Sequence, residues 1–317
     1  MAIDIRALRY FEAVATHRSF SSAAEQLHIA QPALSLQIRK LEEELGRQLM
    51  VRTSRGVTLT PAGEKFLGHA QDIVRRPNAA RDDVRGDVQV PEGPVAVGMP
   101  QSLSKFLTVP LISLALQRWP KVRLQIIELN TGYVPEFLLS GRIDLGLTFF
   151  PQSTFPFTYT HLLDEELVLV GRPGAYPPID ERRWSEASAV SLAAIAEMPL
   201  VLPIMMHSLR ELIEGFARQR RLRLNVVAEV NAIAQLLDLA AAGVGSTVLS
   251  YASVRESLTR GEISAARISA PPITRPVYLC RMKNPLTTGP IGAVEGLMLE
   301  IVRTLVGAGS WPAQLAQ

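Results

Sequence analysis

The 317-residue sequence predicts an α/β multidomain protein, and three observations carry that prediction. Residues 1–60 contain short helical patterns followed by one hairpin, and residues 61–88 form one long, polar helical pattern. From Val95 onward, short apolar strands alternate with helical stretches, an order typical of mainly parallel sheets. Residues 87–94 are rich in Pro and Gly and mark the boundary before this larger part.

Composition and charge narrow the class of protein. Apolar residues make up 47% and charged residues 20%, as in an ordinary globular protein, and the formal net charge is only +3. Any role in binding nucleic acid must therefore come from where the basic residues lie. The N-terminus has no signal-peptide core and no stretch approaches 18 apolar residues, so we expect a cytoplasmic protein without a membrane span.

The single cysteine, Cys280, excludes a disulfide within one chain and a cysteine-based zinc site. It lies in the apolar strand pattern of residues 277–280, which favours an inert buried thiol over a reactive one.

The first two helices are expected close to the N-terminus. A helix over residues 4–17 has four apolar residues on one face, namely Ile5, Leu8, Phe11 and Val14. A second helix follows, capped either by Ser22, with Glu25 at capping-box spacing, or by Ser21. Small residues at Ala23 and Ala24 let this helix pack closely against a neighbour.

The third helix is predicted from Gln31 to Gly46, with Pro32 in its first turn. One face is apolar (Leu34, Ile38, Leu41, Leu45), and the opposite face carries Pro32, Ser35, Leu36, Arg39, Lys40 and Glu43. An uncharged beginning and a basic middle fit a helix that enters the DNA major groove. The Gln31 amide could then bond a base edge, and Leu36 is either a stray surface leucine or a contact to a thymine methyl group.

A hairpin with its turn at Arg55-Gly56 is predicted over residues 49–59. On their own, Arg52 and Arg55 would more often be solvated surface residues. Beside the helix pair, they indicate a wing that reaches DNA phosphates, which completes a winged helix-turn-helix over residues 1–60.

The ordered set of short motifs resembles the LysR-type transcriptional regulators. The runs that carry the resemblance are residues 8–14 (LRYFEAV), 19–24 (SFSSAA), 31–35 (QPALS), 41–46 (LEEELG) and 59–63 (LTPAG). It is dense over residues 3–66, and the later pattern fits out to about residue 306. The resemblance implies DNA contacts by Gln31, Pro32, Ser35, Arg39, Arg52 and Arg55. Many relatives have a basic residue where Leu36 stands, so this protein is expected to read its groove with less charge there.

A long linker helix is expected over residues 61–88, with Thr60 as its cap. Its apolar or small positions follow a heptad spacing: Phe66, Ala70, Ile73, Pro77, Ala80 and Val84. The seam could pack on its own domain or pair two chains. The resemblance favours pairing in a homo-oligomer, and it favours a homotetramer over a dimer. Our hypothesis is that Pro77 kinks this helix near residues 75–76 and sets the angle between the two halves.

The C-terminal half, residues 93–306, resembles the effector-binding domain of the family, which is similar to type 2 periplasmic binding proteins. This implies a first lobe of residues 93–162 and 270–306, a second lobe of residues 163–269, and a ligand in the cleft between them.

Residues at strand ends and helix starts are the candidates for contacting a small-molecule effector. They are Ser102, Leu103, Ser104, Thr131, Gly132, Thr148, Phe149, Pro203, His207, Asn231 and Gly245. At the helix start of residues 100–104, free N–H groups and the hydroxyls of Ser102 and Ser104 suit a carboxylate or similar anion. Alternatively, one serine merely caps its helix and His207 is structural. The segments 100–104 and 202–210 resemble the branch of nitrogen assimilation control regulators. Relatives there often have a basic residue near Met205 or Met206, and its absence argues against an anionic effector in favour of a more apolar ligand, or none.

Catalytic residues, a bound metal and cofactors are not expected. The five histidines are dispersed, no nucleophile or metalloprotease motif is present, and adjacent acidic pairs such as Glu165-Glu166 are typical of solvated or capping residues. We therefore predict a transcription regulator that binds double-stranded operator DNA and, if it is an activator, RNA polymerase. The alternatives are a soluble enzyme or a solute-binding receptor that uses the same cleft.

Overall fold

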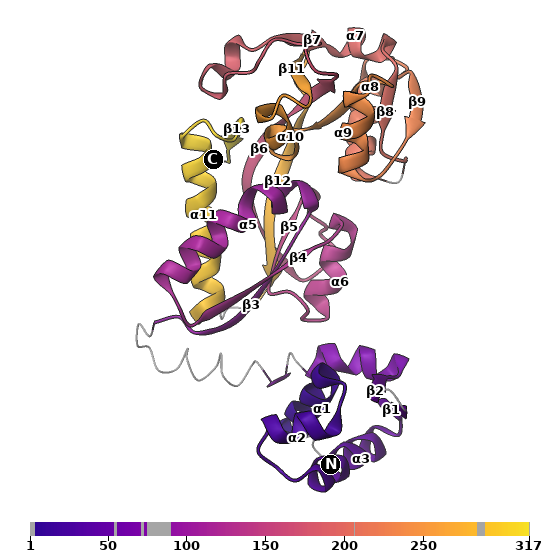
Figure 1. The fold of residues 1–317 in the computed structure, drawn as a ribbon, viewed down its shortest axis with the longest axis vertical. Coiled ribbons are helices and arrows are strands. Elements are labelled where there is room, and N and C mark those ends of the chain that lie inside the picture. Colours follow the sequence, from indigo (N-terminus) through magenta and orange to yellow (C-terminus); the bar gives the residue numbers. More distant parts are fainter. Residues whose placement is uncertain are drawn as a thin grey trace.

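The structure is a computed structural model that describes residues 4–53, 56–70, 73–74, 90–205, 207–283 and 289–316 (Figure 1); of Arg52 and Arg182 it describes only the backbone. It confirms an N-terminal helical domain followed by a two-lobed α/β part. No described helix combines the length and the apolar character needed to cross a membrane.

The N-terminal domain is built as its apolar periodicity predicts. Its elements are α1 (Ile5–His17), α2 (Phe20–Gln26), α3 (Gln31–Leu45) and the antiparallel hairpin of β1 (Met50–Thr53) and β2 (Gly56–Leu59). Leu8 and Phe11 of α1 are fully buried against Leu34 of α3 in one core that the small residues of α2 complete. Ala23 and Ala24 are buried in this core, and the far face of α3 is exposed to solvent.

The helix ends are fixed by local hydrogen bonds. Asp4 caps α1 by accepting the N–H of Arg6, and Gly46 ends α3 with a left-handed φ of 62°. The expected caps of α2 are wrong: the cap is Ser19, whose Oγ accepts the N–H of Ser22 at 3.3 Å. The helix starts earlier because Phe20 is its first buried residue and joins the core.

The helix after the hairpin covers residues 61–70, and residues 73–74 are helical as well. Thr60 caps it as predicted, because its Oγ1 accepts the N–H of Gly63 at 3.0 Å. Phe66 packs edge-to-face on Phe11, with ring centroids 5.3 Å apart, and Ala70 is fully buried in the same core. Two of the predicted seam positions therefore face their own domain. Pro77, Ala80, Val84 and the predicted kink lie outside the described residues.

The C-terminal part contains one large sheet of strand order β4-β3-β5-β12-β6-β11-β7, onto which β10 and β13 also pair. The strands are β3 (Gly93–Met99), β4 (Val122–Glu128), β5 (Leu145–Thr148), β6 (Phe157–Gly171), β7 (Ala189–Ser191), β10 (Thr247–Ser250), β11 (Ser264–Ser269), β12 (Thr274–Met282) and β13 (Ala313–Leu315). A separate parallel pair joins β8 (Leu200–Leu202) and β9 (Val226–Glu229).

The prediction of mainly parallel sheets is wrong, because the sheet is mixed. Strands β3, β4 and β5 pair in parallel, whereas β10, β11, β12 and β13 all run antiparallel to β6. The helices that pack on these strands are α5 (Gln101–Arg118), α6 (Val134–Leu139), α7 (Leu192–Glu197), α8 (Ser208–Gln219), α9 (Ile233–Ala241), α10 (Tyr251–Thr259) and α11 (Gly289–Gly307), with short 3-10 turns at Thr131–Tyr133 and Glu181–Glu186.

Two hydrophobic cores define the two lobes. The core of lobe one includes Val97, Leu103 and Leu163, and the core of lobe two includes Leu169, Leu202 and Val248. Strand β6 starts in a smaller cluster of lobe one at Phe157 and then contributes Leu163 to the first core and Leu169 to the second, while β12 pairs along it in the opposite direction. The two strands that join the lobes therefore lie side by side at the hinge.

Two features of lobe one depend on residues distant in sequence. Trp311, beyond the predicted end of the lobe at residue 306, is 1% exposed and packs edge-to-face on Phe106 of α5. Cys280 is buried as predicted and donates its S–H to the carbonyl oxygen of Gly146, and burial raises the pKa of its thiol to about 12. Such a thiol is almost entirely protonated at neutral pH and is a poor nucleophile.

Candidate functional site

The outer face of α3 carries polar, basic and apolar side chains side by side. Pro32 and Arg39 are exposed, and Leu36 is 49% exposed although it is a large apolar residue. At the helix start, Gln31 Nε2 donates a hydrogen bond to Ser35 Oγ at 2.9 Å, which holds the amide along the helix. The amide oxygen can still accept a hydrogen bond from a base. The structure thus brings Gln31, Pro32, Ser35, Leu36 and Arg39 together on this side of the domain.

The hairpin lies next to this helix pair and is tied to it. The backbone of Arg52 pairs with Val57, and the N–H of Val57 donates to the carbonyl oxygen of Arg18 at 2.8 Å. Gly56 has a φ of 119°, and a side chain there would lie 2.7 Å from the Arg18 oxygen, so glycine is required. The side chain of Arg52 and all of Arg55 lie outside the described part of the chain.

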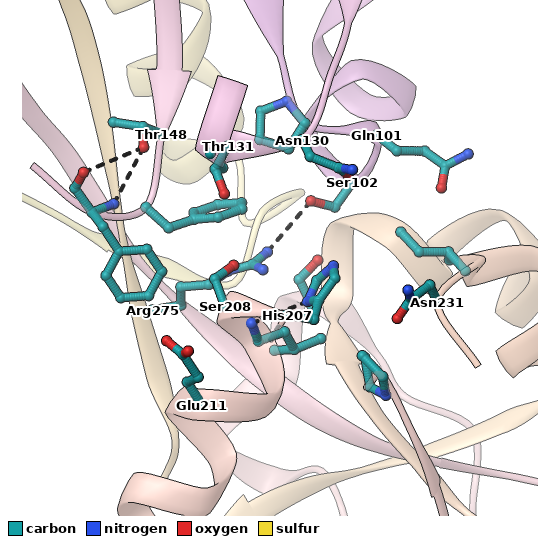
Figure 2. Close-up of a pocket in the computed structure, with 18 of the residues that line it drawn as sticks. Gln101, Ser102, Asn130, Thr131, Thr148, His207, Ser208, Glu211, Asn231 and Arg275 are labelled. Carbon is teal, nitrogen blue, oxygen red and sulfur yellow. Dashed lines mark hydrogen bonds between the residues drawn. The ribbon is translucent and has the colours of Figure 1, made fainter. Parts of the chain in front are cut away.

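A cavity of about 610 Å³ lies between the two lobes (Figure 2). Its walls come from the start of α5, the turn at Thr131–Tyr133, the end of β5, the β8–α8 connection, α9, the β10–α10 junction and β12. Eight sequence-predicted residues line it: Ser102, Thr131, Gly132, Thr148, Phe149, Pro203, His207 and Asn231. The parallel strands of lobe one end at this cavity, where α5 begins.

Three of the predicted residues do not line the cavity. Leu103 is fully buried in the core of lobe one, one residue further along α5 than Ser102. Ser104 turns to Thr108, with the two hydroxyl oxygens 3.2 Å apart. Gly245 packs on the backbone of Pro199, where a side-chain carbon would approach the carbonyl oxygen to 2.8 Å. Its glycine serves close backbone packing in lobe two.

Arg275 is the main cavity residue that the sequence did not predict. It lies on β12, is 3% exposed, and pairs in register with Glu165 of β6, which is fully buried. Its Nε donates to Glu165 Oε1 at 2.9 Å. The interpretation of Glu165 as a solvated or capping residue is therefore wrong, because it is buried and a long-range partner compensates its charge. The signal available in the sequence was a charged residue inside an apolar strand pattern on each of two strands.

His207 lies on the lobe-two side of the cavity and caps α8. Its Nδ1 accepts the N–H of Leu209 at 3.2 Å, so a neutral ring carries its proton on Nε2. Burial, and then the positive charge of Arg275, lower the pKa of this imidazole below its usual value. The neutral side chain can offer one donor to a ligand.

Asn231 and the serines of the β10–α10 junction have defined partners. Asn231 Oδ1 accepts the N–H of Ile204 at 3.1 Å, which holds the loop after β8. Ser250 donates to Ser253 Oγ, and Ser253 donates to the carbonyl oxygen of Ser250, so these cavity hydroxyls are satisfied within lobe two. Among the described residues, no group of three or more His, Cys, Asp or Glu side chains could hold a metal ion.

A second cavity, of about 740 Å³, lies on lobe two between α10 and residues 174–181. None of the sequence-predicted residues lines it. Its principal polar groups satisfy one another, because Glu181 accepts hydrogen bonds from both Tyr251 and Arg255. The cavity between the lobes is therefore the stronger candidate site.

Comparison with known proteins matches both halves of the chain. Residues 5–64 match the family described as bacterial regulatory helix-turn-helix protein, lysR family, and residues 89–300 match the LysR substrate binding domain. The chain is 31% identical over 301 residues to the nitrogen assimilation regulatory protein nac of Klebsiella aerogenes, covering 95% of each. It is 30% identical to the nac protein of Escherichia coli K12, covering 96% of this chain and 97% of the relative.

Solved structures show the same fold. A full-length OxyR variant from Pseudomonas aeruginosa has a TM-score of 0.72 at 23% identity, covering 96% of this chain and 95% of that one. Full-length CbnR in complex with its target DNA has a TM-score of 0.62 at 23% identity, with coverages of 95% and 99%.

Proposed function

The chain belongs to the LysR family of bacterial transcription regulators, and we propose that a small molecule in the cavity between its lobes modulates its sequence-specific binding to operator DNA. The observation that carries this proposal is that one cavity is lined by residues of both lobes, next to the two strands that join them. A ligand that touches both lobes binds their closed and open arrangements differently, which is what coupling to DNA requires.

The DNA contacts belong to α3 and the hairpin. Gln31, Ser35 and Leu36 read base edges from the start of α3, while Pro32 lets the helix begin close to the DNA. Arg39, with Arg52 and Arg55 of the hairpin, neutralises phosphates. The exposed Leu36 supports this assignment, because a thymine methyl group would cover an otherwise solvated apolar side chain.

The division of the chain follows from the same proposal. Residues 1–60 bind DNA, residues 61–88 link and dimerise, and residues 93–306 bind the effector, with lobes of 93–162 plus 270–306 and 163–269. Two DNA-binding domains on one dyad-symmetric operator require a homo-oligomer, a dimer or a tetramer. The protein acts in the cytoplasm as a regulator and not as an enzyme, and it contacts RNA polymerase where it activates.

DNA binding as a function of salt tests this function. The purified full-length protein is titrated onto genomic fragments at several salt concentrations, beside Arg55→Ala and Arg39→Ala variants. We expect tight binding to a few fragments that contain an inverted repeat, and a smaller salt dependence in each variant, by about one phosphate contact. The matched control is Arg303→Ala, an exposed arginine of α11. Equal, weak binding to every fragment would contradict the proposal.

A further inference from the structure

Arg275 places a buried positive charge in the wall of the cavity between the lobes (Figure 2). Its Nε and Nη2 both donate to Glu165 Oε1, and Nη2 also lies 3.4 Å from Ser102 Oγ. Burying an ion pair adds little net stability compared with a well-packed apolar pair, because both charges lose their hydration. Stability alone therefore does not account for a charged pair at this place.

One nitrogen of this guanidinium is left for a ligand. Within the described part of the chain, Nη1 of Arg275 makes no hydrogen bond, while the other two nitrogens are engaged. The guanidinium carbon lies 3.5 Å from the centre of the Phe149 ring, which fixes the plane of the group. A charged donor is thus held rigidly at the cavity surface, with two N–H groups that have no acceptor.

The beginning of α5 adds a second attraction for negative charge at the same wall. Pro100 precedes this 18-residue helix, and no side chain caps its free N–H groups. Gln101 and Ser102 of its first turn line the cavity, and Ser102 is the residue that Arg275 touches. Helix N-termini stabilise anions, and here the helix and the guanidinium face one space.

Glu165 keeps Arg275 in place from behind. Its Oε2 accepts the N–H of Trp311 at 3.3 Å, and β13 pairs with residues 163–165 of β6. The carboxylate is thereby fixed on two sides and cannot follow a ligand into the cavity. It also cancels the charge of Arg275, and a further carboxylate, Glu211, lines the cavity. Because Arg275 is the only Lys or Arg side chain among the described residues that line the cavity, the donors left over are its Nη1 and the free N–H groups of α5, which suit one carboxylate and not two.

We infer that the effector is a monocarboxylate whose carboxylate accepts hydrogen bonds from Arg275 Nη1 and from the first turn of α5. This inference rests on the proposed function, since it names the chemical class of the effector in the same cavity. It reverses the expectation drawn from Met205 and Met206: the cation that those positions lack comes from β12, about seventy residues later in the chain.

The test compares acids with their amides by the thermal unfolding of the full-length protein. Acetate, hexanoate and benzoate are each measured against acetamide, hexanamide and benzamide at equal ionic strength, with sulfate and phosphate as further arms. We expect at least one acid to raise the Tm of the wild-type protein clearly more than its amide does, because ligands that bind only the folded state stabilise it. If no acid exceeds its amide, or if only sulfate or phosphate stabilises, the inference is overturned.

Variants of the Glu165–Arg275 ion pair test whether the stabilisation by acids comes from binding at this pair. Glu165→Gln with Arg275→Gln removes both charges and leaves no unpaired charge buried, and Arg275→Lys keeps a charge opposite Glu165 but supplies no Nη1. We expect both to weaken acid binding at least about tenfold, as for the loss of a charged hydrogen bond. An unchanged affinity in Arg275→Lys overturns the inference even if the double variant does not fold.

The matched control is Glu166→Gln with Arg267→Gln, the neighbouring ion pair between β6 and β11, which does not line the cavity. We expect it to keep the acid response, and a loss equal to that of the first pair would overturn the inference. Operator binding, measured in parallel, reports on the proposed function separately. If amides bind as well as acids while the protein still binds its operator, the inferred class of effector is wrong but the proposed function as a regulator stands.

Discussion

A substitution at Gln31 distinguishes recognition of the DNA sequence from non-specific electrostatic attraction to DNA. Its amide is held by Ser35 at the start of α3 and carries no charge. We predict that Gln31→Ala weakens binding to the best operator by about 1–3 kcal/mol and leaves the salt dependence unchanged, because a base contact is lost and no phosphate contact. Titration of operator and unrelated DNA measures both. Gln219→Ala, an exposed glutamine of α8, is the control, and an equal loss on both DNAs would contradict the assignment.

At His207 the lowered pKa predicts a pH dependence of stability. The unfolded chain protonates this imidazole near its usual value of 6.5, whereas the folded chain resists protonation. The contribution of the neutral His207 side chain to the free energy of unfolding is therefore fully present above pH 6.5. It is lost as the pH falls toward the pKa of His207 in the folded state. We expect denaturant unfolding of His207→Asn to lose less stability than the wild type between pH 7 and about pH 5.

Asn is chosen at this position because its Oδ1 can still accept the N–H of Leu209 and keep the cap of α8. His69→Asn, at an exposed position, controls for the loss of an imidazole elsewhere. Identical pH profiles of the wild type and His207→Asn would show that His207 does not supply this dependence.

Among the elements, the helix after the hairpin depends on one close approach. A side-chain carbon at Gly63 would lie 2.0 Å from the carbonyl oxygen of Leu49, which is backbone and cannot turn away. We predict that Gly63→Ala lowers the free energy of unfolding by about 1–3 kcal/mol, as overpacking does. Chemical denaturation measures it.

Gly215→Ala on α8 is the matched control, since it is also a helical glycine but has no atom within 4 Å of the added carbon. There we expect a gain of about 0.5–1 kcal/mol from the better helix former. A gain of similar size at Gly63 would mean that the helix does not cross the hairpin as closely as described.

In the whole molecule, assembly of chains is expected to depend on the apolar residues of the linker helix that stay exposed in one chain. Phe66 and Ala70 are used by their own domain, but Ile73 is 41% exposed. We predict that Ile73→Glu lowers the oligomeric state, because a charge would be buried in the proposed seam between chains. Light scattering after size exclusion measures the mass. Lys65→Glu introduces the same carboxylate, with a larger change of charge, at an exposed position of the same helix and should leave the mass unchanged. An unchanged mass in Ile73→Glu would place the seam elsewhere.

Also at the scale of the molecule, features set by neighbouring residues could be predicted from the sequence, whereas features set by long-range contacts could not. The ends of α1 and α3 were predictable because Asp4 and Gly46 act on residues within one turn. The cap of α2 was not, because burial of Phe20 in the core decided where that helix starts. In the cavity, Ser102 and Thr148 were predictable from strand ends, whereas Arg275 was not, because its partner Glu165 is far away in sequence.

The sequence by itself determined the order of domains, the outer face of α3 and eight of the residues that line the cavity, since periodicity and strand–helix junctions act over a few residues. Only the tertiary structure decided that the sheet is mixed, that Phe66 turns to its own domain, and that β12 supplies the cation of the cavity. The physical reason is that strand direction and the pairing of buried charges depend on which segments meet, and apolar periodicity is the same for either direction of a strand.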